Sequence, residues 1–250
     1  MTSINKVLAV ALNPALDLTG SLNQLSSGKV NLVNHANLHA AGKGVNVAKV
    51  LAELGAEVSI TGFLGSDNPT KFEELFAQLE IDDQFIRVQG ATRTNVKLVD
   101  LMGEVTDVNF PGALISADDV QQFEQRLFEL VEEHHYVVFA GSVPKGVELS
   151  RFSGWIKELG SRGNQVLVDC SGEALYYAIQ AKPSFIKPNQ EELEQWAGSP
   201  LLDLDKVKAQ GEKIAALGIN NVLISRGEKR CAVAESRAVA RGHTRVSQGS

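Results

Sequence analysis

The chain contains the stretch Ala41-Gly42-Lys43-Gly44-Val45-Asn46-Val47-Ala48, followed by Gly55 and by an apolar run that ends at Gly65. A glycine-rich loop that opens directly into a helix presents unpaired backbone N–H groups and the positive helix end to an anion or a hydroxyl-rich ligand. Lys43 adds a charge, and Asn46 adds an amide that both donates and accepts, which favours a phosphorylated polyol over an apolar ligand. The alternative is a turn whose glycines serve only strand-to-helix packing.

Two familiar nucleotide motifs do not occur in this stretch. A Walker loop requires Ser or Thr after its Gly-Lys pair, whereas Gly42-Lys43 is followed by Gly44. A dinucleotide fingerprint requires a third glycine, but residues 45–47 are Val, Asn and Val. A dinucleotide-dependent oxidoreductase is therefore disfavoured.

Length, charge and cysteine count set broad limits. A chain of 250 residues can bury one full α/β core, and its net charge of −6 offers no basic surface for nucleic acid or anionic lipid. Cys170 and Cys231 form neither a disulfide framework nor a metal cluster, which favours a reducing cytoplasm. The apolar run at residues 7–12 is too short for a signal peptide or a membrane span. We expect a cytoplasmic protein without nucleic-acid or membrane partners.

Short apolar runs alternate with amphipathic stretches, as in a parallel sheet covered by helices on both faces. The expected strands are residues 7–12, 58–64, 136–140, 165–168, 184–186 and 222–225. The expected helices are residues 46–54, 116–133, 148–159, 190–197 and 205–217. Ser116 and Asp119 form an expected capping box. The expected buried face of the first helix consists of Val47, Val50, Leu51 and Leu54.

Two segments break this rhythm. Residues 94–100 and 104–110 alternate apolar and polar side chains around Met102-Gly103, which indicates a hairpin. Together with residues 17–33 they are expected to form a small sheet that stands off the main domain. An ordinary sheet edge is the alternative.

The residues after Lys229 differ from the rest of the chain. Residues 230–250 contain no Phe, Trp, Tyr, Leu or Ile and show no helix or strand periodicity. They are expected to be a disordered tail that does not pack.

The opening stretch, with its spacings to Gly55 and Gly65, resembles the first signature of the ribokinase-like, PfkB-type carbohydrate kinases. The resemblance implies a three-layer α/β/α sandwich with a small β-sheet lid over the sugar, a lid that in some relatives is a dimer interface. It also implies ATP and Mg²⁺. Residues 38–51, 93–98 and 108–112 are most similar to the branch that phosphorylates fructose 1-phosphate at O6. Tagatose 6-phosphate and fructose 6-phosphate remain alternative substrates.

The resemblance assigns the sugar site to Asp17, Lys29, Gly42, Lys43, Gly44, Asn46, Arg93 and Ser142. Asp17, in Asn13-Pro14-Ala15-Leu16-Asp17, is expected at the carboxyl end of the first strand, where it would bind the sugar. A turn-capping Asp is the alternative. Lys29, Lys43 and Arg93 are candidate phosphate partners, for which solvated surface charges are the alternative.

The nucleotide side follows from Ile186-Lys187-Pro188-Asn189-Gln190-Glu191-Glu192, which carries the family's Asn-x-x-Glu element. Asn189 and Glu192, supported by Asp169, are expected to hold a hydrated Mg²⁺, and ordinary helix capping is the alternative. Lys187, Ser225 and Gly227 are expected to bind the nucleotide. The last glycine of that Ser-x-Gly-x-x-Gly loop is replaced by Arg230.

No catalytic residue is assigned. The family's base is an Asp in a Gly-Ala-Gly-Asp motif, and the 250 residues contain no such motif. The resemblance to the family is expected to stop at about residue 229. A frameshift or an early end of the coding sequence is the expected explanation. The sandwich is therefore expected to lack its C-terminal part. The rival to an active kinase is a non-catalytic protein that binds sugar phosphate.

Overall fold

The structure, a computed structural model, describes residues 6–226 and 229–235. Its main sheet is formed by β1 (Lys6–Ala11), β4 (Glu57–Gly65), β5 (Asp82–Asp83), β6 (Ile86–Val88), β9 (Tyr136–Ala140), β10 (Gln165–Asp169), β11 (Phe185–Ile186), β12 (Asn221–Arg226) and β13 (Lys229–Glu235). The strand order is β13-β12-β11-β10-β9-β1-β4-β5, and β6 pairs with β4. All neighbouring strands are parallel except β12 and β13.

Helices cover both faces of this sheet. They are α1 (Lys43–Glu53), α2 (Thr70–Gln78), α3 (Ala117–Leu130), α4 (Leu149–Ser161), α5 (Glu173–Ala181), α6 (Gln190–Ala197) and α7 (Leu204–Ala215). Successive β1 residues point to opposite faces: Leu8 and Val10 join a core cluster with α3 to α7, whereas Ala9 and Ala11 join one with α1 and α2. The expected α/β sandwich of three layers is confirmed. Within the described residues, no helix combines the length and apolarity needed to span a bilayer.

The apolar runs predicted β1, β4, β9, β10, β11 and β12 to within two residues at each end, and the periodic stretches predicted α1, α3, α4, α6 and α7 to within three. The capping box of α3 is confirmed, because Ser116 Oγ accepts a hydrogen bond from Asp119 N at 3.1 Å while Asp119 Oδ2 accepts one from Ser116 N at 3.3 Å. Helices α2 and α5 were not predicted.

The predicted buried face of α1 is confirmed for Val47 and Leu51, which pack partly buried against core clusters, and is wrong for Val50 and Leu54. The buried residues of this helix are Gly44, Val45 and Ala48. Val50 is 52% exposed and Leu54 is 79% exposed. The cause is the close approach of α1 to the sheet, because a Cβ on Gly44 would lie only 2.6 Å from the Ala11 Cβ. The helix therefore turns its small residues to the sheet and leaves larger apolar ones outside.

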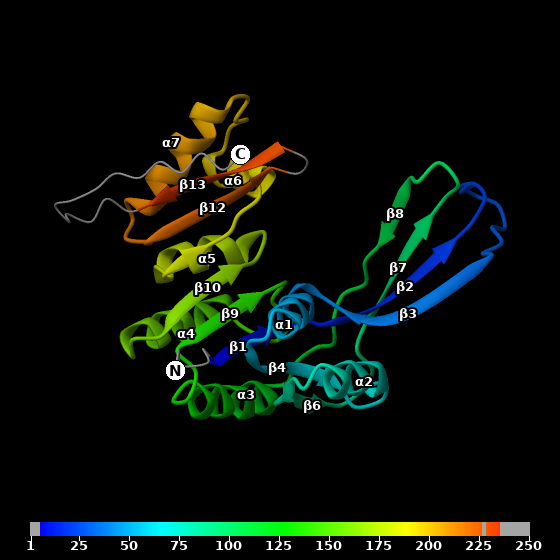
Figure 1. Cartoon of the computed structure of the whole chain (residues 1–250), viewed down its shortest axis with the longest axis horizontal. Coiled ribbons are helices and arrows are strands. Elements are labelled where there is room, and N and C mark those ends of the chain that lie inside the picture. Colours follow the sequence, from blue (N-terminus) through cyan, green and yellow to red (C-terminus); the bar gives the residue numbers. More distant parts are fainter. Residues whose placement is uncertain (1–5, 227–228, 236–250) are drawn as a thin grey trace.

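A second sheet projects from the main domain (Figure 1). It has the order β3-β2-β7-β8, formed by β2 (Ala15–Ser21), β3 (His35–Ala41), β7 (Thr94–Val99) and β8 (Val105–Val108). We call it the lid sheet. The predicted hairpin is confirmed as β7 and β8. Residues 22–33, expected to belong to the sheet, instead connect β2 to β3, a strand that the sequence patterns did not predict.

The expectation of an unpacked tail from residue 230 is wrong for residues up to 235. Strand β13 pairs antiparallel with β12, and its Ala232 and Ala234 are buried. Two small alanine side chains are enough to pack β13 against α7, because that helix presents Gly211. A Cβ added to Gly211 would lie 3.2 Å from the Ala234 Cβ. The absence of bulky apolar residues was therefore the wrong criterion for this segment. Residues 236–250 lie outside the described residues.

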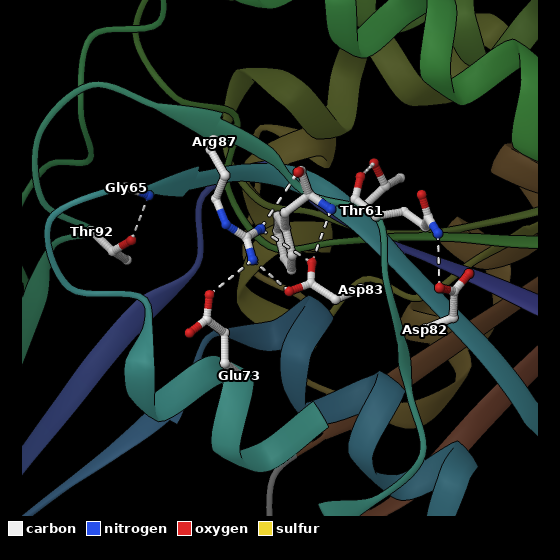
Figure 2. Close-up of polar contacts among 9 residues, drawn as sticks. Thr61, Gly65, Glu73, Asp82, Asp83, Arg87 and Thr92 are labelled. Atoms are coloured by element: carbon white, nitrogen blue, oxygen red, sulfur yellow. Dashed lines mark hydrogen bonds and ion pairs between the residues drawn. The ribbon is translucent and has the colours of Figure 1, made fainter. Parts of the chain in front are cut away.

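Polar contacts anchor the segment between β4 and β7 (Figure 2). Gly65 N donates to Thr92 Oγ1 at 2.9 Å, and Thr61 Oγ1 donates to the Gln84 carbonyl at 2.9 Å. The Arg87 guanidinium pairs with Asp83 at 2.6 Å and with Glu73 at 3.4 Å, and the pKa of Arg87 is raised mainly by its hydrogen bond to Asp83. These contacts fix the point at which the chain returns to the lid sheet.

We predict that Gly65→Ala destabilises the protein. The added Cβ would lie 2.2 Å from Thr92 N and 2.6 Å from the Gly90 carbonyl oxygen, so residues 90–92 must move. Overpacking of this kind typically costs about 1–3 kcal/mol, which urea unfolding followed by circular dichroism would measure. Gly154→Ala is the control, because no atom lies within 4 Å of the added methyl group. Equal unfolding free energies for the two variants would contradict the prediction.

Candidate active site

Asp169, at the carboxyl end of β10, joins two lysines from other elements. Its Oδ1 accepts a hydrogen bond from Lys43 Nζ at 2.9 Å, and its Oδ2 is 2.9 Å from Lys187 Nζ. Lys43 begins α1, and Lys187 follows β11. Three predicted residues thus meet at the edge of the sheet where ligands of open α/β folds bind.

The cluster of Lys43, Asp169 and Lys187 carries a net positive charge. Asp169 is buried, whereas both lysine side chains are partly exposed. One carboxylate balances only one of the two ammonium groups, and each ammonium group has further N–H donors. The arrangement is suited to holding a phosphate group delivered from solvent.

The glycine loop packs Gly42 against the start of the lid sheet and begins α1 at Lys43. Gly42 is the N-cap of α1 with φ +105°, a conformation that side-chain-bearing residues rarely adopt, and a Cβ there would lie 3.2 Å from Pro14 Cα. The Asn46 amide N–H donates to the Gly42 carbonyl at 2.9 Å, which closes the first helical turn, and the Asn46 side chain is exposed. Ligand contacts of Gly42, Gly44 and Asn46 stay predictions.

Asn189 and Glu192 form a capping box at the start of α6. Asn189 Oδ1 accepts from Glu192 N at 2.7 Å, and Glu192 Oε2 accepts from Asn189 N at 2.8 Å. The capping alternative is therefore present, and a metal role for these residues stays a prediction. No three His, Cys, Asp or Glu side chains among residues 6–226 and 229–235 are grouped to coordinate an ion directly.

Cys170, the residue after Asp169, is a buried thiol. Burial, together with the negative charges of Asp169 and Glu192, raises the pKa of the Cys170 thiol to about 12. The thiol stays protonated at neutral pH and is not a nucleophile here. Carboxylate oxygen atoms are ligands that a hydrated Mg²⁺ prefers, but the metal role of Asp169 and Glu192 stays a prediction.

Asp17 lies within the lid sheet, on β2, rather than at the end of β1 as expected, because the chain turns at Asn13-Pro14 and starts a new strand. The carboxylate is buried and accepts hydrogen bonds from Asn95 Nδ2 at 3.2 Å and from Lys97 Nζ at 3.0 Å. The sequence reasoning missed both partners. Their spacing of two on an alternating strand was the available signal, because it places both side chains on one face.

Arg93 bonds to the backbone at the base of the lid sheet. Its Nε donates to the Pro14 carbonyl at 3.3 Å, its Nη1 to the Phe110 carbonyl at 2.9 Å and its Nη2 to the Asn13 carbonyl at 3.0 Å. Burial lowers the pKa of Arg93, but a guanidinium remains charged at neutral pH. Three of its five N–H donors are thus used structurally, and its predicted phosphate contact stays a prediction.

Ser142 is tied to a residue that the sequence analysis did not assign. Its Oγ accepts a hydrogen bond from Asn13 Nδ2 at 2.9 Å. Asn13 also lies against Gly112, where an added Cβ would be 2.0 Å from Asn13 Oδ1. Asn13 therefore links the loop after β9 to the base of the lid sheet. Its place in the Asn-Pro opening was the only signal for this role.

The remaining predicted residues are Lys29, Ser225 and Gly227, and the structure describes the first two. Lys29 lies in the connection between β2 and β3, at the end of the lid sheet away from the main domain (Figure 1), so it does not join Lys43 and Lys187. Ser225 lies on β12, and its N–H donates to the Pro188 carbonyl at 3.1 Å, beside Asn189. Gly227 lies outside the described residues.

Comparison with known proteins places this site in a family context. A model of the pfkB family carbohydrate kinases matches residues 10–247, so the likeness is not confined to the residues before Lys229. The 1-phosphofructokinase of Vibrio cholerae is 52% identical over 222 residues, which are 89% of this chain and 70% of that protein. The 1-phosphofructokinase of Haemophilus influenzae is 44% identical over 223 residues, which are 89% of this chain and 71% of that protein.

Solved structures show the same fold. Escherichia coli phosphofructokinase-2 in complex with fructose-6-phosphate has a TM-score of 0.85 at 25% identity, covering 99% of this chain and 82% of that one. A possible 1-phosphofructokinase from Thermotoga maritima has a TM-score of 0.83 at 28% identity, covering 92% of this chain and 75% of that one.

We predict that Arg93→Ala lowers the free energy of unfolding by about 1.5–3 kcal/mol, because charged hydrogen bonds to three carbonyls are lost. The expected loss of unfolding free energy is larger than the loss from removing an exposed surface charge. Arg162→Ala is the control, because Arg162 pairs with Glu158 on the exposed side of α4, where such pairs contribute less than about 1 kcal/mol. Thermal and urea unfolding measure both variants. An Arg93→Ala protein as stable as the wild type would show that the lid base does not depend on the guanidinium.

Proposed function

The chain belongs to the pfkB family of carbohydrate kinases, and we propose that it transfers the γ-phosphoryl group of ATP to O6 of fructose 1-phosphate, giving fructose 1,6-bisphosphate. ATP-dependent phosphorylation of a sugar phosphate is the activity of its family and of its curated relatives. The observation that carries the proposal is the Lys43–Asp169–Lys187 cluster at the end of the main sheet. Tagatose 6-phosphate and fructose 6-phosphate are the alternative substrates.

Phosphoryl transfer demands positioning and charge neutralisation more than covalent chemistry from the protein. Lys43 and Lys187 can bind phosphate oxygens while they keep their contacts with Asp169, since each ammonium has donors beyond the one that Asp169 accepts. Backbone N–H groups at the start of α1 add the positive end of the helix dipole. Asp17 on the lid sheet would accept hydrogen bonds from sugar hydroxyls, and Asn95 and Lys97 hold its carboxylate in place.

A kinase of this family implies ATP as a substrate and typically a divalent metal ion. Asp169 and Glu192, with Asn189 beside them, would hold a hydrated Mg²⁺, because oxygen donors and retained water suit that ion. When bound, the ion supplies charge neutralisation on the phosphates of ATP. The protein side chains supply position and the remaining positive charge.

A second candidate is sugar-phosphate binding without rapid turnover. The observation that favours it is the lack of a Gly-Ala-Gly-Asp motif in the 250 residues. A general base and an anion hole each contribute about two or more decades of rate in enzymes that use them. Binding and turnover must therefore be measured separately.

We predict that fructose 1-phosphate raises the melting temperature of the 250-residue polypeptide and that Asp17→Asn removes this shift, because a ligand that binds only the native state stabilises it. Asp205→Asn, in the exposed first turn of α7, is the control and should keep the shift. Formation of fructose 1,6-bisphosphate from ATP should be slower than about one turnover per second. Faster turnover would exclude the second candidate, and equal shifts for all three proteins would remove Asp17 from the site.

A homodimer through the lid sheet is the proposed assembly. Strand pairing aligns Leu18 with Leu38 and Val96, and Val96 with Val108, so these apolar side chains share one face. Leu38 and Val108 are exposed. An apolar row of this kind, on a sheet face without a covering helix, fits the same row of a second copy. A structure of the E. coli phosphofructokinase-2 is described as a tetrameric inhibited form.

We predict that Leu38→Glu weakens self-association by at least about tenfold, because it places a charge on an exposed member of the apolar row, at its β3 end. Sedimentation velocity across a concentration series measures the dimer dissociation constant. Asn37→Glu is the matched control, since Asn37 is the adjacent residue of β3 and its side chain points to the opposite face. If both variants dimerise like the wild type, the apolar face of the lid sheet is not the interface.

A further inference from the structure

The polar face of the lid sheet carries a cation beside Asp17 to which no function has been assigned. We propose that Lys97 is a specificity-determining residue that binds the phosphate group already present on the sugar substrate. This rests on the proposed function, because it assumes that the substrate is a sugar phosphate.

Strand register places Lys97 on the sugar side of the lid. Asp17 aligns with Asn95 across the parallel β2–β7 pair, and Thr19 aligns with Lys97. Residues two positions apart on a strand share a face with each other and with the residues aligned beside them. Asp17, Asn95 and Lys97 therefore project on the same side, opposite the apolar row. The 3.0 Å contact between Lys97 Nζ and Asp17 Oδ2 confirms this.

The ammonium group lies between the carboxylate and solvent. The side chain of Asp17 is 10% exposed, whereas that of Lys97 is 40% exposed. An ammonium has three N–H donors, and Asp17 accepts one of them. The other donors can meet the oxygen atoms of a ligand that lies against Asp17, without breaking the existing bond.

Charge also favours a phosphate contact here. An unpaired Asp17 would repel a sugar phosphate dianion, and Lys97 offsets that charge at the point of contact. The hydrogen bond that Lys97 donates to Asp17 and the nearby charge of Asp107, which lies across from Lys97 on β8, raise the pKa of Lys97. The side chain therefore stays protonated throughout the neutral range.

The other described cations near the lid are committed elsewhere or distant. Arg93 uses three donors on backbone carbonyls, and Lys29 lies at the far end of the lid sheet. Lys43 and Lys187 share Asp169, which lies at the end of a strand of the main sheet and not on the lid. A hexose bisphosphate product carries phosphate groups at its two ends, so one site requires two separated centres of positive charge.

The test compares Lys97→Gln with Lys97→Arg in the full 250-residue chain. Glutamine can still donate to Asp17 but carries no charge, whereas arginine keeps the charge. Calorimetry gives the dissociation constant of fructose 1-phosphate at low and high NaCl concentration. Lys71→Gln is the matched control, because Lys71 is 46% exposed and pairs with Glu74 at 2.7 Å, away from the site on α2.

We expect Lys97→Gln to weaken binding of fructose 1-phosphate by about tenfold or more and to reduce the salt dependence of binding, because a charge-assisted bond is lost. Lys97→Arg should bind within about threefold of the wild type, and Lys71→Gln should match it. Three outcomes would overturn the inference: unchanged binding in Lys97→Gln, weaker binding with unchanged salt dependence, or equal losses in the Gln and Arg variants. A wild type that binds no fructose 1-phosphate would overturn the proposed substrate as well.

Discussion

The geometry of the whole site depends on the guanidinium of Arg93. The chain passes between the main domain and the lid sheet four times, near residues 13–14, 41–42, 92–93 and 110–112. Arg93 lies at one of these crossings and donates hydrogen bonds to carbonyls at two others. Asp17, which would bind the sugar, lies on the lid, whereas the other proposed ligand contacts at Lys43, Asp169 and Lys187 lie on the main domain. Their relative position is therefore set at this junction, whatever the stability of either sheet.

The two faces of the lid sheet differ in character because its side chains alternate, and each face carries one of the two proposed tasks, sugar contact and self-association. One face carries Asp17, Asn95 and Lys97, and the other carries the row from Leu38 to Val108. A shift of one residue in strand register would exchange the two faces and place apolar side chains over the sugar. Substrate contact and self-association are therefore not independent properties of this sheet, since the same hydrogen-bond register sets both.

The main sheet was predictable because buried parallel strands are continuous apolar runs, as Val7–Leu12 and Tyr136–Ala140 illustrate. Strand β3 was not, because its residues from His35 to His39 are exposed and show no alternating apolar pattern. The failure at α1 has another cause. Periodicity marks apolar residues, whereas a helix that approaches a sheet closely selects small ones such as Gly44.

Residue types at strand ends predicted much of the candidate site but not its pairing. Asp169 was expected at the end of its strand, yet its bond to Lys43 spans 126 positions and leaves no local signal. The partners of Arg93 were equally unpredictable. Its charge is visible in the sequence, but the three carbonyls that it contacts come together only when the lid has folded.

The buried thiol of Cys170 has a consequence for the chemical durability of the site. With a pKa of about 12, only about one molecule in 10⁵ carries a thiolate at pH 7. Peroxide and electrophiles react with thiolates, so this cysteine is protected although it adjoins Asp169. Oxidation to a sulfinic acid there would add an anion to a cluster that must attract phosphate. The burial that makes the residue inert would thus also protect the proposed phosphate site from oxidation.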